Sequence, residues 1–181
     1  MPDNDPECNP PPEQYEEALQ SYLFKPLRET WIKIIQESKN ANSEPYFDHV
    51  SQWLIHPQLL EADGEFPTIF VLTPDGTFER HGMGKSLVQY KALITLQFEY
   101  YCKHYKRNVT NECEHFIERI IYLVMKNQNV PFNKIGTTNL CTSQLTLNNF
   151  SINFFGRGKH VIRYAIVNAV ANIPALIVEP P

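Results

Sequence analysis

Gly82-Met-Gly-Lys-Ser-Leu-Val-Gln-Tyr90 occurs a second time, 74 positions later, as Gly156-Arg-Gly-Lys-His-Val-Ile-Arg-Tyr164. Two glycines, one lysine and one tyrosine recur in place, and Leu/Val, Val/Ile and Gln/Arg pair between the copies. A repeat with conserved order at a fixed spacing indicates that one small structural unit is present twice.

Each copy of this motif lies between strand-like residues and a long apolar stretch. Residues 68–72 and 77–78 precede the first copy, and residues 144–147 and 150–155 precede the second. The stretches that follow, 87–101 and 161–173, lack turn signals, and we expect both to be helices.

Isoleucine-rich segments at helical spacing stand at the start of each unit, at 27–39 and 114–126. A proline and an aromatic residue follow each of them, as Pro45-Tyr46 and Pro131-Phe132. The order in each unit is therefore helix, strands, glycine turn and helix, which predicts an α+β protein. An amphipathic pattern at 13–24 predicts an extra N-terminal helix.

This order resembles the double-stranded-RNA-binding domain (dsRBD), whose first strand follows a Pro-x-Tyr-like sequence and whose last helix follows a Gly-x-Gly turn. The resemblance implies two α-β-β-β-α domains in tandem, at 26–107, with a loop insertion, and at 108–181. An acidic, Pro-rich tail plus the short helix would occupy 1–25.

The lysine cluster that opens the last helix in this family contacts phosphates across a major groove. Aligned without gaps, its first two positions hold Leu87 and Val88 in one unit, and Val161 and Ile162 in the other. Aliphatic side chains neutralise no phosphate, so each replacement lowers the affinity for RNA. These residues suit a buried surface or one covered by a partner.

The first unit is longer than the second between its proline and its first motif glycine, by 37 against 25 positions. The surplus is acidic, which would repel a phosphate backbone. It begins near Trp53 and Leu54, and its apolar residues either pack locally or dock a partner.

Charge is divided unevenly along the chain. Residues 1–66 hold 4 Lys+Arg against 13 Asp+Glu, a net −9, whereas residues 67–181 hold 12 against 7, a net +5. The basic second part supports an alternative function in duplex-RNA binding. The residues expected to carry it are Lys85, Lys91, Lys103, Lys106, Arg157, Lys159 and Arg163.

A metal site and a catalytic site are both disfavoured. Cys102, His104, Cys113 and His115 are suitable ligand types for zinc, but their spacing matches no usual zinc finger. No phosphate-binding loop, zinc-deaminase motif or nucleophile elbow is present. We therefore expect no metal, no cofactor and no enzyme activity.

The cellular location is predicted from the hydrophobic runs, the first residues and the cysteines of the chain. No apolar run approaches the roughly 20 residues of a membrane span, and the acidic first residues do not resemble a signal peptide. Four cysteines without a Cys-x-x-Cys pair suit reduced thiols. We expect an intracellular protein, nuclear or cytoplasmic, with no membrane partner.

The sequence thus predicts a non-catalytic adaptor or regulatory subunit. The resemblance implies, as its partner, an RNA-processing enzyme of the Dicer-type nuclease or adenosine deaminase class, together with homodimerisation through the degenerate domains. The predicted protein contacts are Leu87, Val88, Val161, Ile162, Trp53 and Leu54. The alternative is a double-stranded-RNA-binding protein with shape-specific, salt-sensitive duplex binding.

Overall fold

The computed structural model describes residues 23–55, 66–83, 88–103, 109–135, 138–157 and 160–178. These residues form two α-helices and seven strands, which confirms the α+β class. In chain order they are α2 (Lys25–Gln36), β1 (Gln52–Leu54), β2 (Thr68–Leu72), β3 (Gly76–Met83), β4 (Val88–Lys103), α3 (Val109–Lys126), β5 (Asn129–Ile135), β6 (Thr138–Arg157) and β7 (His160–Val178). The helix predicted at 13–24 lies outside the described residues except for Leu23 and Phe24.

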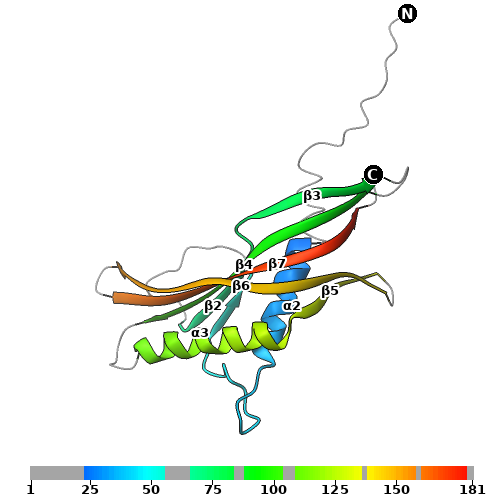
Figure 1. Cartoon of the computed structure of the whole chain (residues 1–181). Coiled ribbons are helices and arrows are strands. Elements are labelled where there is room, and N and C mark those ends of the chain that lie inside the picture. The colour runs from blue at the N-terminus through cyan, green and yellow to red at the C-terminus, as the bar shows by residue number, and fades with distance from the viewer. Residues whose placement is uncertain are drawn as a thin grey trace, which may run out of the picture.

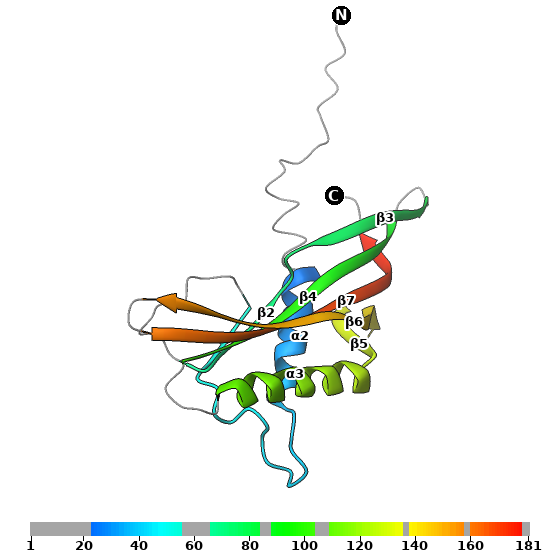
Figure 2. The same cartoon turned by 60° about the vertical axis from the view of Figure 1, so that its left-hand side comes forward.

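All seven strands belong to one sheet with the order β1-β2-β4-β7-β6-β5, and β3 pairs with β4. The central strands β4 and β7 pair antiparallel from Val88 opposite Val178 to Lys103 opposite Ile162. Both helices lie against one face of this twisted sheet (Figures 1 and 2). The two repeated halves therefore share a single sheet, and a tandem dsRBD arrangement is not confirmed.

The helices predicted at 87–101 and 161–173 are wrong, because both segments are strands. Every second residue of β4 from Ala92 to Cys102 is at most 2% exposed. Between them, Leu93 is exposed and Thr95 and Gln97 are partly buried, whereas Glu99 is buried at 7% exposure. A period of two is the pattern of a strand, and it overrides the missing turn signals on which the helix prediction depended.

Small side chains line the inner face of β7. Ala165, Val167, Ala169 and Ala171 are at most 1% exposed and face the helices. Their small volume lets α3 lie close to this part of the sheet, and α3 contacts β7 more than any other strand.

The repeated glycine motif connects the strands of two long hairpins. Met83 pairs with Val88 across the first copy, and Arg157 pairs with His160 across the second. The unit that occurs twice is therefore a helix followed by strands that end in a long hairpin. A glycine-rich connection suits a tight hairpin as well as the helix entrance that the resemblance implied.

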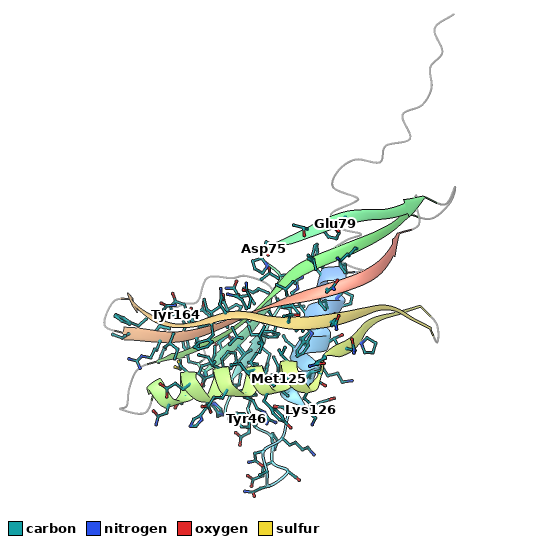
Figure 3. The ribbon with its side chains drawn as sticks, viewed as in Figure 1. Tyr46, Asp75, Glu79, Met125, Lys126 and Tyr164 are labelled. Carbon is teal, nitrogen blue, oxygen red and sulfur yellow. The ribbon has the colours of Figure 1, made fainter. Side chains whose placement is uncertain are left out.

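The core lies between the helices and the inner face of the sheet. Pro26 occupies the first turn of α2, where its missing N–H costs nothing, and Leu27, Trp31 and Ile35 point inward. The Trp31 ring packs edge-on against Phe98 of β4, with ring centroids 5.5 Å apart. Figure 3 shows the side chains gathered between the sheet and the two helices.

The opposite face of the sheet carries a separate aromatic cluster. Tyr101 of β4 stacks on Tyr164 of β7 at 5.2 Å and meets Phe70 of β2 edge-on at 5.5 Å. The Tyr101 hydroxyl donates a hydrogen bond to Glu99 at 2.8 Å. Burial, followed by the charge of Glu99, raises the pKa of Tyr101, so this phenol stays neutral.

Candidate functional site

β6 extends beyond its neighbour at the edge of the sheet. β5 pairs only with residues 138–144 of β6, whereas β7 pairs with residues 144–157. From residue 146 onward, the side of β6 that faces away from β7 pairs with no strand in the described ranges. An open edge of this kind presents backbone N–H and C=O groups that another strand can pair with.

Exposed apolar residues line this edge on the side that faces the helices. Phe150 and Ile152 pair with the buried Val167 and Ala165, and directly paired residues share a face. We define the β6 patch as the exposed apolar residues at this end of β6 and β7: Phe150 (61% exposed), Ile152 (36%), Phe154 (73%) and Val161 (42%).

A β-bulge directs these side chains to the inner face. Leu147 pairs with Ala169 and Asn149 pairs with Asn168, so Asn148 is an extra residue. Odd-numbered residues face the core before the bulge, and even-numbered residues face the same side after it. The amide Nδ2 of Asn168 donates to Asn149 Oδ1 at 2.7 Å next to the bulge.

This edge strand carries no charged residue before Arg157, at its end. Residues 138–156 contain no Asp, Glu, Lys or Arg. Natural edge strands commonly carry lysine or proline, which discourage pairing with another chain. The exposed part of β6 has neither lysine nor proline. If this part paired with the same strand of a second copy, no like charges would face each other.

The residues predicted to contact a partner protein lie in different parts of the structure. Val161 belongs to the β6 patch, whereas Ile162 is 0% exposed within this chain, which is the buried alternative that the sequence left open. The prediction placed both residues on one helix face, whereas neighbours in a strand point to opposite faces. Leu87 lies outside the described residues, and Val88 is described by its backbone alone.

Trp53 and Leu54 lie in β1 and are half-buried. The Trp53 ring packs edge-on against Phe47 at 6.2 Å, so this end of the insertion packs locally. The residues that sequence reasoning missed are Phe150, Ile152 and Phe154. Their signal was available, as an apolar residue at every second position of an uncharged run.

The described cations of the predicted RNA surface do not gather on one face. Lys91 and Lys103 lie toward opposite ends of β4, roughly 40 Å apart at 3.3 Å per residue. Lys103 lies over the Phe66 ring at 5.0 Å, and Arg163 pairs with Cys102 on the inner face. Lys85, Lys106 and Lys159 lie outside the described residues, and Arg157 is described by its backbone alone.

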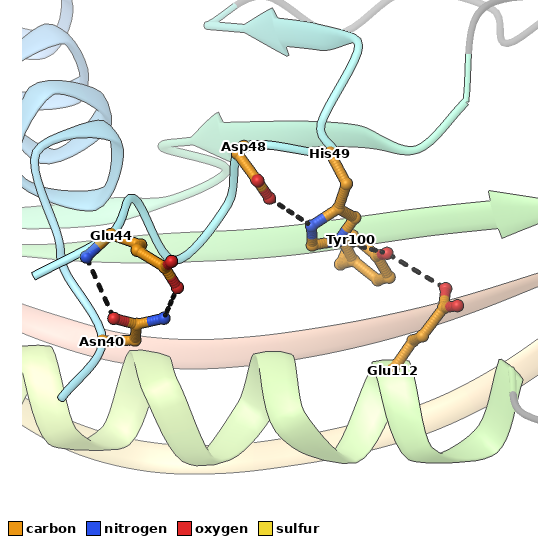
Figure 4. Close-up of polar contacts among 6 residues, drawn as sticks. All are labelled: Asn40, Glu44, Asp48, His49, Tyr100 and Glu112. Atoms are coloured by element: carbon orange, nitrogen blue, oxygen red, sulfur yellow. Dashed lines mark hydrogen bonds and ion pairs between the residues drawn. The ribbon is translucent and has the colours of Figure 1, made fainter. Parts of the chain in front are cut away.

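A second candidate site is a pocket between the 38–50 loop, β4 and the first turns of α3. Its volume is about 260 Å³, and its lining consists of Tyr46, Phe47, His49, Tyr100, Glu112, His115 and Phe116. A chain of polar contacts crosses it (Figure 4). The Tyr100 hydroxyl lies 3.3 Å from His49 Nε2 and donates to Glu112 Oε2 at 3.3 Å.

Two features fix the protonation and orientation of this chain. Burial, followed by the nearby Cys102 and Glu112, raises the pKa of Tyr100 and keeps the phenol neutral. The Asp48 carboxylate lies 3.6 Å from His49 Nδ1, on the other side of the imidazole ring. A neutral, buried phenol is a poor nucleophile, so the arrangement suits binding better than covalent catalysis.

The first part of the loop that forms one wall of the pocket, residues 39–46, is held by several contacts. Asn40 Oδ1 accepts hydrogen bonds from the N–H groups of Asn42 at 2.9 Å and Glu44 at 3.0 Å. Asn40 Nδ2 donates to Glu44 Oε2 at 2.9 Å (Figure 4). Arg119 of α3 lies over the Tyr46 ring at 4.5 Å and donates to the Lys39 carbonyl.

Three of the four residues in the disfavoured zinc set lie in the described part of the chain, and these three do not converge. Cys102 and Cys113 are buried with their sulfur atoms 3.9 Å apart, and the hydrogen bond between them raises the pKa of Cys102 and lowers that of Cys113. His115 is exposed and pairs with Glu118, and His104 lies outside the described residues. Among the described residues no group of three or more His, Cys, Asp or Glu could hold a metal ion.

Comparisons with known proteins supply no further assignment. In the described ranges no helix has the length and apolar character needed to cross a membrane. No protein-family model and no curated protein sequence matches this chain.

Proposed function

We propose that the protein is a non-catalytic interaction subunit that dimerises through the exposed edge of β6. The observation that carries this proposal is the β6 patch, whose phenylalanines Phe150 and Phe154 are 61% and 73% exposed on an open strand that carries no charge before Arg157. Large apolar side chains beside unpaired backbone groups favour association with another strand. A second copy of the chain supplies a strand with the same properties.

If β6 pairs with β6 of a second copy about a two-fold axis at Ile152, apolar residues lie opposite apolar residues. In an antiparallel pair centred there, Ile152 lies opposite Ile152 of the second copy, and Phe150 lies opposite Phe154 of the second copy. Directly opposed aromatic pairs contribute about 0.2–1 kcal/mol each relative to alanine pairs. The interface is then isologous, as in most homodimers, and the two sheets continue into one another.

The wider adaptor role stays a prediction. The partner class that the dsRBD resemblance implies, an RNA-processing enzyme, has less structural support than the dimer. The last helix of each expected domain is a strand here, β4 or β7. A partner protein could still add its own strand to the same edge, as in other cases of β-augmentation.

The dimer is tested by measuring the mass of the full-length chain over a range of concentrations with light scattering after gel filtration. Ile152→Lys would place two ammonium groups opposite each other at the axis, so we expect wild type to be dimeric and this variant monomeric. Phe78→Lys is the matched control, because Phe78 is a 41% exposed apolar residue on the distant strand β3. A monomeric wild type, or a dimeric Ile152→Lys variant, contradicts the proposal.

The alternative function is tested with the same samples. A duplex of roughly 20 base pairs accommodates the approximately 16 base pairs that one dsRBD spans. Binding that weakens steeply with salt would support duplex-RNA binding through the lysines and arginines, because phosphate contacts release counterions. Absence of binding at low salt would exclude RNA as a direct ligand.

A further inference from the structure

We propose that the pocket formed by the 38–50 loop, β4 and α3 binds a small organic cation of the ammonium class. This site is separate from the β6 patch, so the inference does not depend on the dimer. Three properties of the pocket support it: its aromatic walls, its negative charge and its size.

Four aromatic rings form most of the walls: Tyr46, Phe47, Tyr100 and Phe116. They hold one another in place, since Tyr100 stacks on Phe116 at 5.2 Å and Phe47 meets Phe116 at 6.0 Å. Tyr46 in turn meets Phe47 at 4.9 Å. Aromatic rings attract cations through their quadrupoles, and aromatic cages recognise ammonium ligands for this reason.

The charge of the lining residues has the matching sign. Glu112 is a carboxylate in the lining, and no lysine or arginine is among the lining residues. Asp48 adds a second carboxylate behind His49. Arg119 of α3, which lies near Tyr46 of the lining, is engaged by the rings of Tyr46 and Tyr122. The pocket therefore presents negative charge to a ligand.

Glu112 keeps acceptor capacity for this ligand. Tyr100 donates to its Oε2 atom, and an ionised carboxylate offers about four acceptor positions. The same hydrogen bond fixes the direction of the carboxylate relative to the ring wall. His49 and His115 also line the pocket, with groups that can accept or donate a hydrogen bond.

The volume restricts the ligand to a small molecule. About 260 Å³ equals the liquid volume of roughly nine water molecules. A trimethylammonium group with a short polar arm is small enough for a space of this volume.

Calorimetric titration of the full-length chain with choline tests the proposal. The neutral control ligand is dimethylbutanol, in which carbon replaces the ammonium nitrogen at nearly equal shape. We expect choline to bind about tenfold more tightly than this isostere, because the rings and Glu112 act on the charge. Glu112→Gln keeps an acceptor for the Tyr100 hydroxyl but removes the charge, and should weaken choline binding by about tenfold.

Glu114→Gln is the matched control variant. Glu114 is an exposed carboxylate on the same helix that does not line the pocket, so its replacement should leave choline binding unchanged. Three outcomes would each overturn the assignment. They are equal affinity for choline and its isostere, an equal loss of choline affinity in both variants, and no binding of choline at millimolar concentration. Thermal unfolding of Glu112→Gln at the wild-type temperature excludes a folding defect as the cause of lost binding.

Discussion

β4 and β6 both direct alternating apolar side chains to the same face of the sheet, yet only one of them is covered. Phe98 of β4 is 0% exposed, whereas Phe154 of β6 is 73% exposed. β4 has strands on both sides and Trp31 of α2 above it, while the outer half of β6 pairs, among the described strands, with β7 alone. The alternation determines which face a side chain occupies, and the neighbouring elements determine whether that face is buried.

The difference shows where each strand obtains its stability. The apolar side chains of β4 are buried within one chain, and each contributes about 1.5–3 kcal/mol relative to an exposed side chain. Those of the β6 patch gain such a contribution only when another surface covers them. Folding of the monomer should therefore depend on β4, and association should depend on β6.

The largest expected effect contrasts two phenylalanine truncations. Phe98→Ala should lower the free energy of unfolding by about 3–5 kcal/mol, because it leaves a cavity under Trp31. Phe154→Ala should change the unfolding of the monomer by less than about 0.5 kcal/mol, as expected for an exposed site, but should weaken the dimer. Urea unfolding of both variants, at a protein concentration too low for dimers to form, measures the two losses of stability. Equal losses of unfolding free energy in Phe98→Ala and Phe154→Ala would contradict the distinction between covered and uncovered strands.

A smaller effect concerns the phenol buried on β4. Tyr100→Phe removes one hydroxyl that contacts His49 and Glu112, and should cost about 0.5–1.5 kcal/mol at neutral pH. Burial raises the pKa of Tyr100 above the usual value of 10.0, so its neutral form stabilises the fold fully below pH 10.0. That stability is lost as pH rises, because the unfolded chain ionises first.

The pH dependence provides a direct measurement. Above pH 10.0 the wild-type free energy of unfolding should fall more steeply than that of Tyr100→Phe, by at most about 1.4 kcal/mol per pH unit for the one group. Tyr122→Phe, on the exposed side of α3, is the control and should follow the wild-type curve. Identical slopes in wild type and Tyr100→Phe would show that the covered face does not protect this phenol.

The helices were predictable because their periodicity is strong. The segments at 27–39 and 114–126 are confirmed as α2 and α3 with shifted ends, since their apolar residues recur at helical spacing. β2 at 68–72 is confirmed as well. In these places the local pattern and the tertiary packing favour the same structure.

The long strands were mispredicted although their signal is present. Ile94-Thr-Leu-Gln-Phe-Glu99 alternates apolar and polar residues, which is the period of a strand. The length of the apolar stretch at 87–101 and its lack of turn signals led to the opposite assignment, a helix. Two features were beyond the sequence: the bulge at Asn148, which changes the inward-facing positions, and the pocket, whose residues come from three separate segments.

The smallest expected effect concerns the loop that helps cover the inner face. Arg119 holds this loop through the Tyr46 ring and the Lys39 carbonyl, so Arg119→Gln should cost about 0.5 kcal/mol and speed hydrogen exchange at 38–50. Lys126→Gln is the control, because Lys126 meets only the Tyr122 ring, at 5.9 Å, among the described cation–ring contacts. If exchange at 38–50 is unchanged in Arg119→Gln, the loop stays in place without this contact, and the cover over Tyr100 must come from the packing of Phe47 and Phe116 alone.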